Sequence, residues 1–173
     1  PGLKHLEGLK PEFYYGEWDS ARASGNLSTS LRERGYVTIY NHPIWSRVKA
    51  EEIRNTPGLT GVEIFNYNTV NESGTGYDTY CWDLMLREGR WVHAFASDDN
   101  HNEGLFPDSG GGYICVKAER LSHDAIIENI LAGNFYSSSG PTIHAWGIRE
   151  GSVFVECSPV NRINFIAGNY VNA

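Results

Sequence analysis

Two carboxylates and a histidine follow an apolar run in the middle of the chain. Residues 91–96 are mostly apolar, and Asp98, Asp99 and His101 come directly after them. In an extended backbone, side chains two residues apart point to the same side, so those of Asp99 and His101 would lie on one side of the chain. A carboxylate and an imidazole together suit Zn, Mn or Fe, and a carboxylate oxygen can bridge two ions. The alternative is a solvated turn with a surface histidine.

A second apolar run, fifty residues earlier, ends in His42-Pro43. Pro43 removes a ladder donor and stops the strand, which would hold His42 at the rim of a sheet. The alternative is a histidine that bonds only the backbone at its strand end. Arg47 follows closely and could bind a phosphate or carboxylate through its two-pronged guanidinium, although a surface arginine is the ordinary role.

Glu63 lies inside the apolar segment 61–65. Charged side chains are rarely buried without a partner. We therefore expect Glu63 to face the site and to orient His42, as outer partners of metal ligands do. The alternative is an outward-facing edge position.

Helical and extended patterns alternate between residues 27 and 136. This order is typical of βα units around a parallel sheet or barrel, in which ligands bind at the carboxyl ends of the strands. Residues 66–76 and 98–112 are predicted to be loops, and three short alternating segments after Thr142 predict antiparallel strands. The first predicted helix would be capped by Asn26 or Ser28 and end at about Arg34. The predicted strands are 36–40, 59–65, 91–96 and 113–116, the other predicted helices are 48–55, 77–88 and 123–132, and the tail segments are 142–148, 152–157 and 162–167.

Composition narrows the function classes for this 173-residue chain. Its net charge of −7 argues against a nucleic-acid partner, which needs a basic surface. No apolar segment is long enough to suggest a membrane span. Three widely spaced cysteines form neither a zinc pattern nor a disulfide framework, which favours free thiols and a cytoplasmic location. No Gly-x-Ser-x-Gly motif occurs, so a serine hydrolase of that type is excluded.

Four ordered motifs resemble the PHP family, the polymerase-and-histidinol-phosphatase metal-dependent phosphoesterases. They are Tyr-Asn-His-Pro-Ile-Trp-Ser-Arg at 40–47, Gly-Val-Glu-Ile-Phe-Asn-Tyr at 61–67, Ala-Ser-Asp-Asp-Asn-His at 96–101, and Gly-Asn-Phe-Tyr-Ser-Ser-Ser-Gly-Pro at 133–141. The resemblance implies an α/β fold, part of a distorted (β/α)₇ barrel. It also implies two or three Mn, Zn or Fe ions in the intact family site.

The resemblance assigns metal ligation to His42, Asp99 and His101, with Asp99 and His101 also catalytic. His5, in His-Leu-Glu-Gly-Leu, is similar to a further family histidine. Asp98 then becomes a supporting residue. The family's first motif, His-x-His, does not occur in this chain. We therefore expect residues 1–141 to form a partial barrel whose N-terminal βα units are missing, with 142–173 as a β-rich extension.

The expected function is hydrolysis of a small phosphorylated substrate by a metal-activated water, which would make the intact parent protein an enzyme. One alternative is a non-catalytic PHP-like binding or structural module with an incomplete metal site. A weaker alternative is a metal-dependent amidohydrolase. Neither a nucleic-acid nor a membrane partner is expected, and the sequence leaves the oligomeric state open.

Overall fold

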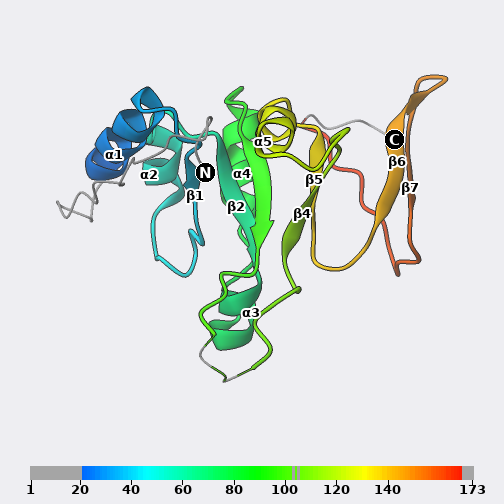
Figure 1. Ribbon diagram of the computed structural model, residues 1–173, viewed down its shortest axis with the longest axis horizontal. Coiled ribbons are helices and arrows are strands. Elements are labelled where there is room, and N and C mark those ends of the chain that lie inside the picture. The colour runs from blue at the N-terminus through cyan, green and yellow to red at the C-terminus, as the bar shows by residue number, and fades with distance from the viewer. Residues whose placement is uncertain (1–20, 103, 105, 169–173) are drawn as a thin grey trace.

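The computed structural model describes residues 21–102, 104 and 106–168. Five helices and five strands are interspersed over the described part of residues 21–138, and a β-hairpin follows (Figure 1). The elements are α1 (Ala21–Glu33), β1 (Ile39–Tyr40), α2 (Ala50–Asn55), β2 (Gly61–Asn66), α3 (Tyr67–Ser73), α4 (Thr79–Arg87), β3 (His93–Ser97), β4 (Tyr113–Val116), α5 (His123–Leu131), β5 (Phe135–Ser138), β6 (Ile143–Arg149) and β7 (Ser152–Cys157).

The central sheet contains β1, β2 and β3, in that order and all parallel. Ile39 lies opposite Gly61, and Gly61 lies opposite His93, so the three carboxyl ends meet at one edge. This parallel arrangement agrees with the alternation of helices and strands in the sequence. It brings residues 41–47, 66–72 and 98–102 to the same edge of the sheet, which is where the candidate site is found.

The predicted (β/α)₇ barrel is wrong. A barrel requires each strand to have a neighbour on both sides. Within the described residues, β1 contributes only two residues to the sheet, and the ladder ends there. The helix α5 connects β4 to β5, yet these two strands pair antiparallel and form a separate sheet. The helix between β4 and β5 therefore does not make these two strands parallel, although the sequence pattern predicted a parallel βα unit.

Two apolar cores stabilise the two faces of the central sheet. On one face, Val62 of β2 packs with Ile53 of α2 and Met85 of α4. On the other face, Phe95 of β3 packs with residues of α5, including Ile127. Alternating side chains of a strand point to opposite faces, so burial of Val62 in the first core turns its neighbour Glu63 towards the second.

Several local predictions differ from the structure. Residues 67–73 form helix α3 rather than a loop, because Asn66 caps its N-terminus by accepting a hydrogen bond from the Thr69 N–H at 2.9 Å. Helix α1 begins earlier than predicted, and β1 is shorter. The segment 162–167 is not a strand. Helix α4 buries Cys81 and Met85, whereas its Tyr80 is 68% exposed.

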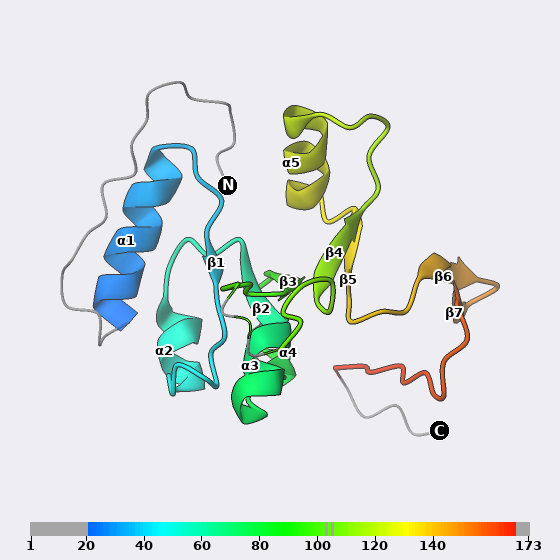
Figure 2. The same ribbon diagram turned by 60° about the horizontal axis from the view of Figure 1, so that its bottom comes forward.

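The tail contains the predicted antiparallel pair, β6 and β7, as a hairpin. It lies apart from the central sheet in both ribbon views (Figures 1 and 2). Trp146, Ile148 and Val153 of this hairpin are more than half exposed. Whether 142–173 is a separate extension stays a prediction. Among the described helices, none is both long and apolar enough to cross a membrane.

Candidate functional site

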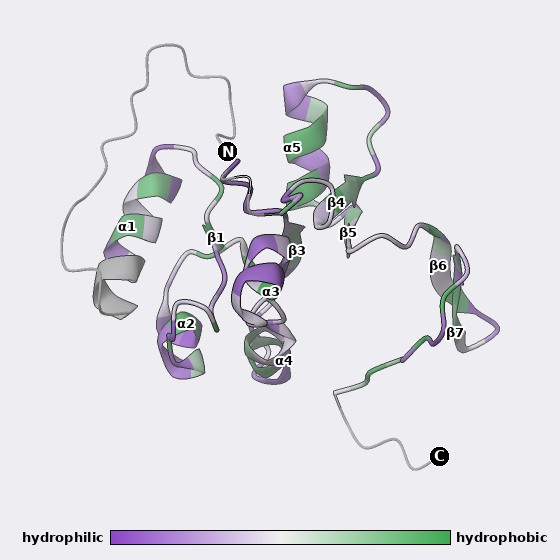
Figure 3. Ribbon diagram, turned by 90° about the horizontal axis from the view of Figure 1, so that it is seen from below, coloured by the Kyte–Doolittle hydropathy of each residue, from purple (hydrophilic) through white to green (hydrophobic). Residues whose placement is uncertain are grey.

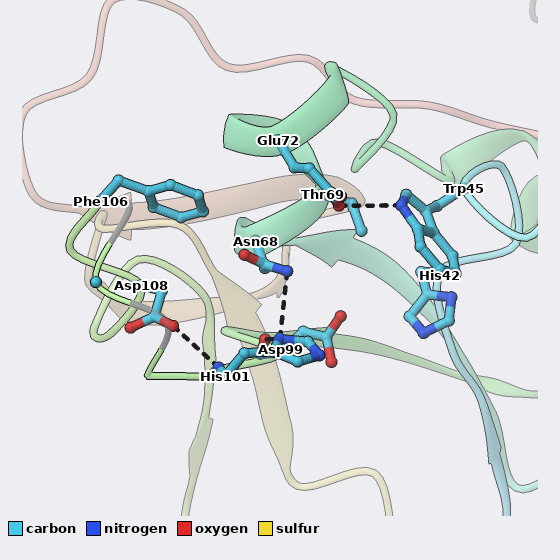
Figure 4. A pocket seen from close by; sticks show the side chains of 10 residues that line it. His42, Trp45, Asn68, Thr69, Glu72, Asp99, His101, Phe106 and Asp108 are labelled. Atoms are coloured by element: carbon cyan, nitrogen blue, oxygen red, sulfur yellow. Dashed lines mark hydrogen bonds between the residues drawn. The ribbon is translucent and has the colours of Figure 1, made fainter.

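A cavity of about 270 Å³ opens at the carboxyl edge of the central sheet. The loop after β1, helix α3 and the loop after β3 supply its walls (Figure 4). It therefore unites segments that are up to 66 positions apart, from residue 42 to residue 108. The lining residues are His42, Trp45, Asn68, Thr69, Glu72, Asp99, His101, Gly104, Phe106 and Asp108.

His42 forms one wall of the cavity. Its backbone is in the left-handed region, with φ of 30°, which is unusual for a residue with a side chain. The Nδ1 atom of the ring lies 2.9 Å from the Ser46 hydroxyl, so Nε2 is the nitrogen left for a ligand. Trp45 packs edge-on against the ring at 5.0 Å, and its indole N–H donates to Glu72 at 3.1 Å.

Asp99 and His101 line the same cavity, but not through an extended backbone. Asp99 has φ of 52°, so the alternation assumed from the sequence does not hold there. His101 Nδ1 is 2.6 Å from the Asp99 carbonyl oxygen and 3.3 Å from Asn68 Nδ2. A carbonyl only accepts and an amide NH₂ only donates, so the two contacts require opposite tautomers. The shorter contact favours a proton on Nδ1 and a lone pair on Nε2.

Glu63 lies beneath the cavity and is 2% exposed. One carboxylate oxygen accepts the backbone N–H of His42 at 2.6 Å and the side-chain amide of Asn66 at 3.0 Å. The other oxygen accepts from the Ser97 hydroxyl. Glu63 thus connects the ends of all three parallel strands. It contacts His42 through the main chain and not through the imidazole, which the sequence could not specify.

Asp98 is not among the described residues that line the cavity. Its two oxygens accept the backbone N–H groups of Gly110, Gly111 and Gly112 at 2.6 to 2.8 Å. This residue therefore closes the base of the loop 98–112. Arg47 is exposed and is not among the described residues that line the cavity. His5 lies outside the described residues.

Asp108 organises the backbone around His101. One of its oxygens accepts the N–H groups of His101 and Asn102, both at 2.9 Å, and Asn100 donates to the other. The hydrogen bond from the His101 N–H, supported by that from Asn102, lowers the pKa of Asp108. The sequence analysis missed Asp108 because it lies within a long loop without periodicity.

Helix α3 contributes three cavity residues that the sequence analysis also missed, namely Asn68, Thr69 and Glu72. They were missed because residues 66–76 were predicted to be a loop. This short helix is mostly polar, as its purple colour in Figure 3 shows. The available signal was an asparagine at the end of a strand, a residue type that favours helix N-caps.

Asp78 supports the His42 loop from below. It is fully buried, and one oxygen accepts the Ile44 N–H at 2.7 Å. The other oxygen has no hydrogen-bond partner. Burial, together with the nearby charge of Glu63, outweighs the Ile44 hydrogen bond and His42 and raises the pKa of Asp78 to about 6.

The described side chains of the cavity offer oxygen and nitrogen lone pairs to a cation but no lysine or arginine charge to an anion. Glu72, Asp99 and Asp108 are acidic members of this lining. His42, Asp99 and His101 are suitable metal donors by type. Within the described residues, however, no three His, Cys, Asp or Glu side chains are close enough together to hold an ion. The described donors alone thus do not form a metal centre.

Comparison of the chain with protein-family models, with curated proteins and with solved structures finds no match.

Proposed function

We propose that the cavity belongs to a metal-dependent phosphoesterase that hydrolyses a small phosphorylated substrate. The observation that supports this most is the convergence of His42, Asp99 and His101, from two distant motifs, on one cavity at the sheet's carboxyl edge. Both histidines engage Nδ1 and leave Nε2 for a ligand. The positive φ of His42 and Asp99 supports the same view, because strained backbone is concentrated at functional sites.

The acidic character of the cavity also favours a role for cations. A phosphate group would be repelled by Glu72, Asp99 and Asp108 unless positive charge were added, because no described cationic side chain lines the walls. A divalent ion such as Mn, Zn or Fe supplies that charge and lowers the pKa of a bound water to near neutrality. The remaining donors would come from residues outside the described part, of which His5 is the candidate in this chain.

The chain's own residues would have separate tasks. His42 and His101 would each present Nε2, and Asp99 one carboxylate oxygen, to a ligand in the cavity. Trp45 and Phe106, which lie on opposite sides of the cavity in Figure 4, would enclose the part of the substrate away from these groups. The exposed position of Arg47 does not support its expected role as a substrate contact.

The test is a phosphatase assay with p-nitrophenyl phosphate, after chelation and again after adding Mn²⁺ or Zn²⁺. We expect activity only with metal, and a loss of at least about 100-fold in His42→Ala and His101→Ala. His123→Ala is the matched control, because His123 is a partly exposed histidine on α5 that pairs with Asp124 outside the cavity. Protein that stays inactive with every added ion would refute the proposal.

A second candidate is a non-catalytic binding module, and the lack of a three-donor cluster among the described residues favours it. Calorimetry separates the two functions: Mn²⁺ binding that depends on His42 and His101, without hydrolysis of a phosphoester, indicates the module. Hydrolysis of an anilide without hydrolysis of phosphoesters indicates the amidohydrolase alternative.

We also infer a reducing compartment such as the cytoplasm. Cys81, Cys115 and Cys157 are all free thiols, and Cys81 is buried. Disulfides are typical of oxidising compartments, so three unpaired cysteines favour a reducing one. Thiol titration of protein purified without reductant should therefore give three thiols after denaturation.

A further inference from the structure

Asn66 occupies the centre of the hydrogen bonds beneath the cavity. It is the last residue of β2, and its side chain is fully buried. The Oδ1 atom accepts the Thr69 N–H at 2.9 Å. Because a backbone N–H only donates, this contact fixes which end of the amide is oxygen and which is nitrogen. The NH₂ group must therefore point towards the carboxylates.

The NH₂ group of Asn66 has one proton for each of two carboxylates. Nδ2 lies 3.0 Å from Glu63 Oε2 and 3.1 Å from Asp99 Oδ2. A neutral amide between two negative groups relieves their repulsion without adding charge. It also leaves Asp99 Oδ1 without a donor among the described residues, so that this oxygen remains for a ligand in the cavity.

Asp99 requires such support, because its backbone is held in a conformation that side chains rarely adopt. Its φ of 52° costs energy relative to an extended backbone, and it persists only when neighbouring contacts favour it. The amide of Asn66 is the side-chain contact that holds the Asp99 carboxylate. The same amide contacts Glu63, which in turn holds the His42 N–H at 2.6 Å.

We propose that Asn66 is a positioning residue that sets the Asp99 carboxylate relative to His42. The inference rests on the proposed function, since it assigns a role within that site. Asn66 does not line the cavity and would touch neither substrate nor ion. It acts through Asp99 and, by way of Glu63, through the backbone of His42. The chain would thus couple its two ligand-bearing loops through one buried amide.

The key variant is Asn66→Ser, since serine is also a strong helix N-cap and keeps the start of α3. It lacks the NH₂ group and cannot reach both carboxylates. Loss of partners behind a metal ligand typically lowers metal affinity or activity by about 10–100-fold. We expect a loss of that size in Mn²⁺ affinity, measured by calorimetry, and in kcat with p-nitrophenyl phosphate, together with a lower Tm because two hydrogen bonds to carboxylates are lost. Asn66→Asp, which adds a third carboxylate, should show a larger loss.

Ser122→Ala is the matched control for a purely structural effect. Ser122 caps α5 as Asn66 caps α3, by accepting the Ala125 N–H at 3.3 Å, and it is not a cavity residue. We expect this variant to lower Tm and to leave Mn²⁺ affinity and kcat unchanged. If Asn66→Ser behaves in the same way, Asn66 is only a helix cap and the inference is overturned.

A crystal structure of Asn66→Ser decides the case independently of activity. We expect the Asp99 carboxylate to leave its wild-type position or the backbone at Asp99 to return to negative φ. An unchanged Asp99 would overturn the inference. If wild-type protein neither binds Mn²⁺ nor hydrolyses the phosphoester, the proposed function fails, and the displacement of Asp99 in this crystal structure still tests the role of Asn66.

Discussion

The loops after β1 and β3 hold their candidate ligands in place by different means. Each loop places a candidate ligand, His42 or Asp99, in the left-handed region just after a parallel strand. The His42 loop is held from outside, by buried carboxylates of Glu63 and Asp78 that accept its N–H groups. The backbone of the Asp99 loop is held from within, because Asp98 and Asp108, both in the loop, accept its own N–H groups.

This difference shows which contacts stabilise each loop. The His42 loop depends on groups that are 21 and 34 positions further along the chain, so its hydrogen bonds require β2 and the start of α4 to be in place. The loop 98–112 closes on itself across 12 to 14 positions. Changes to the supporting carboxylates should therefore affect the two loops in different ways.

The largest expected effect is that of Glu63→Ala. The change leaves three donors without an acceptor, the His42 N–H, the Asn66 amide and the Ser97 hydroxyl. Because each lost bond to a charged group costs about 1.5–3 kcal/mol before water compensates, we expect unfolding free energy to fall by about 3–5 kcal/mol in urea denaturation. Glu63→Gln keeps one acceptor and should lose less. A change below about 1 kcal/mol in Glu63→Ala would contradict external support of the His42 loop.

The next effect is a pH dependence from Asp78. The folded state raises its pKa from 3.8 to about 6, so the folded protein binds this proton more tightly than the unfolded chain. Its contribution to stability is therefore fully present below about pH 4 and is lost as pH rises through 6, by about 3 kcal/mol in total.

Denaturation of wild type and Asp78→Asn between pH 4 and 7.5 isolates this contribution. The difference in unfolding free energy between the two proteins should shift with pH in favour of the variant as pH rises. Glu63→Gln should reduce the shift, because the charge of Glu63 adds to the raised pKa of Asp78. A difference that stays constant with pH would show that Asp78 is ionised as in the unfolded chain.

Asp98→Ala tests the self-contained loop. We expect a loss of about 2 kcal/mol, smaller than for Glu63, because water reaches the exposed Gly110 N–H once the carboxylate is removed. Hydrogen exchange should become faster at Gly110, Gly111 and Gly112 and stay unchanged in the His42 loop. Asp124→Ala, on an exposed site of α5, is the control and should show neither effect. Faster exchange in both loops would show that Asp98 supports more than its own loop.

The smallest expected effect is that of Ser46→Ala. It removes the hydroxyl next to His42 Nδ1 and should cost about 0.5–1 kcal/mol in the same denaturation assay, because one partly buried hydrogen bond is lost. A loss as large as that of Glu63→Ala would mean that the loop is held by its own side chains after all.

The sequence predicted the positions of the candidate ligands better than the structure around them. Apolar runs that end in His42 and in Asp99 marked two strand ends, because buried parallel strands have this pattern. The residue types alone did not separate Asp99 from Asp98, since that choice depends on backbone φ, and only the resemblance to a family assigned Asp98 a supporting role. The sequence analysis also missed α3, whose polar residues give no apolar stripe and whose start depends on the capping of Thr69 by Asn66.

The glycines at 111 and 112 restrict which residues near the cavity can be substituted. A Cβ atom at Gly111 would lie 2.3 Å from the Tyr67 ring, and one at Gly112 would lie 2.4 Å from the Ser97 carbonyl oxygen. A side chain at either position would have to displace the Tyr67 ring or the Ser97 backbone, so we expect substitutions there to be poorly tolerated. Trp45 and Phe106 face the cavity from opposite sides and are the positions at which a variant library should diversify.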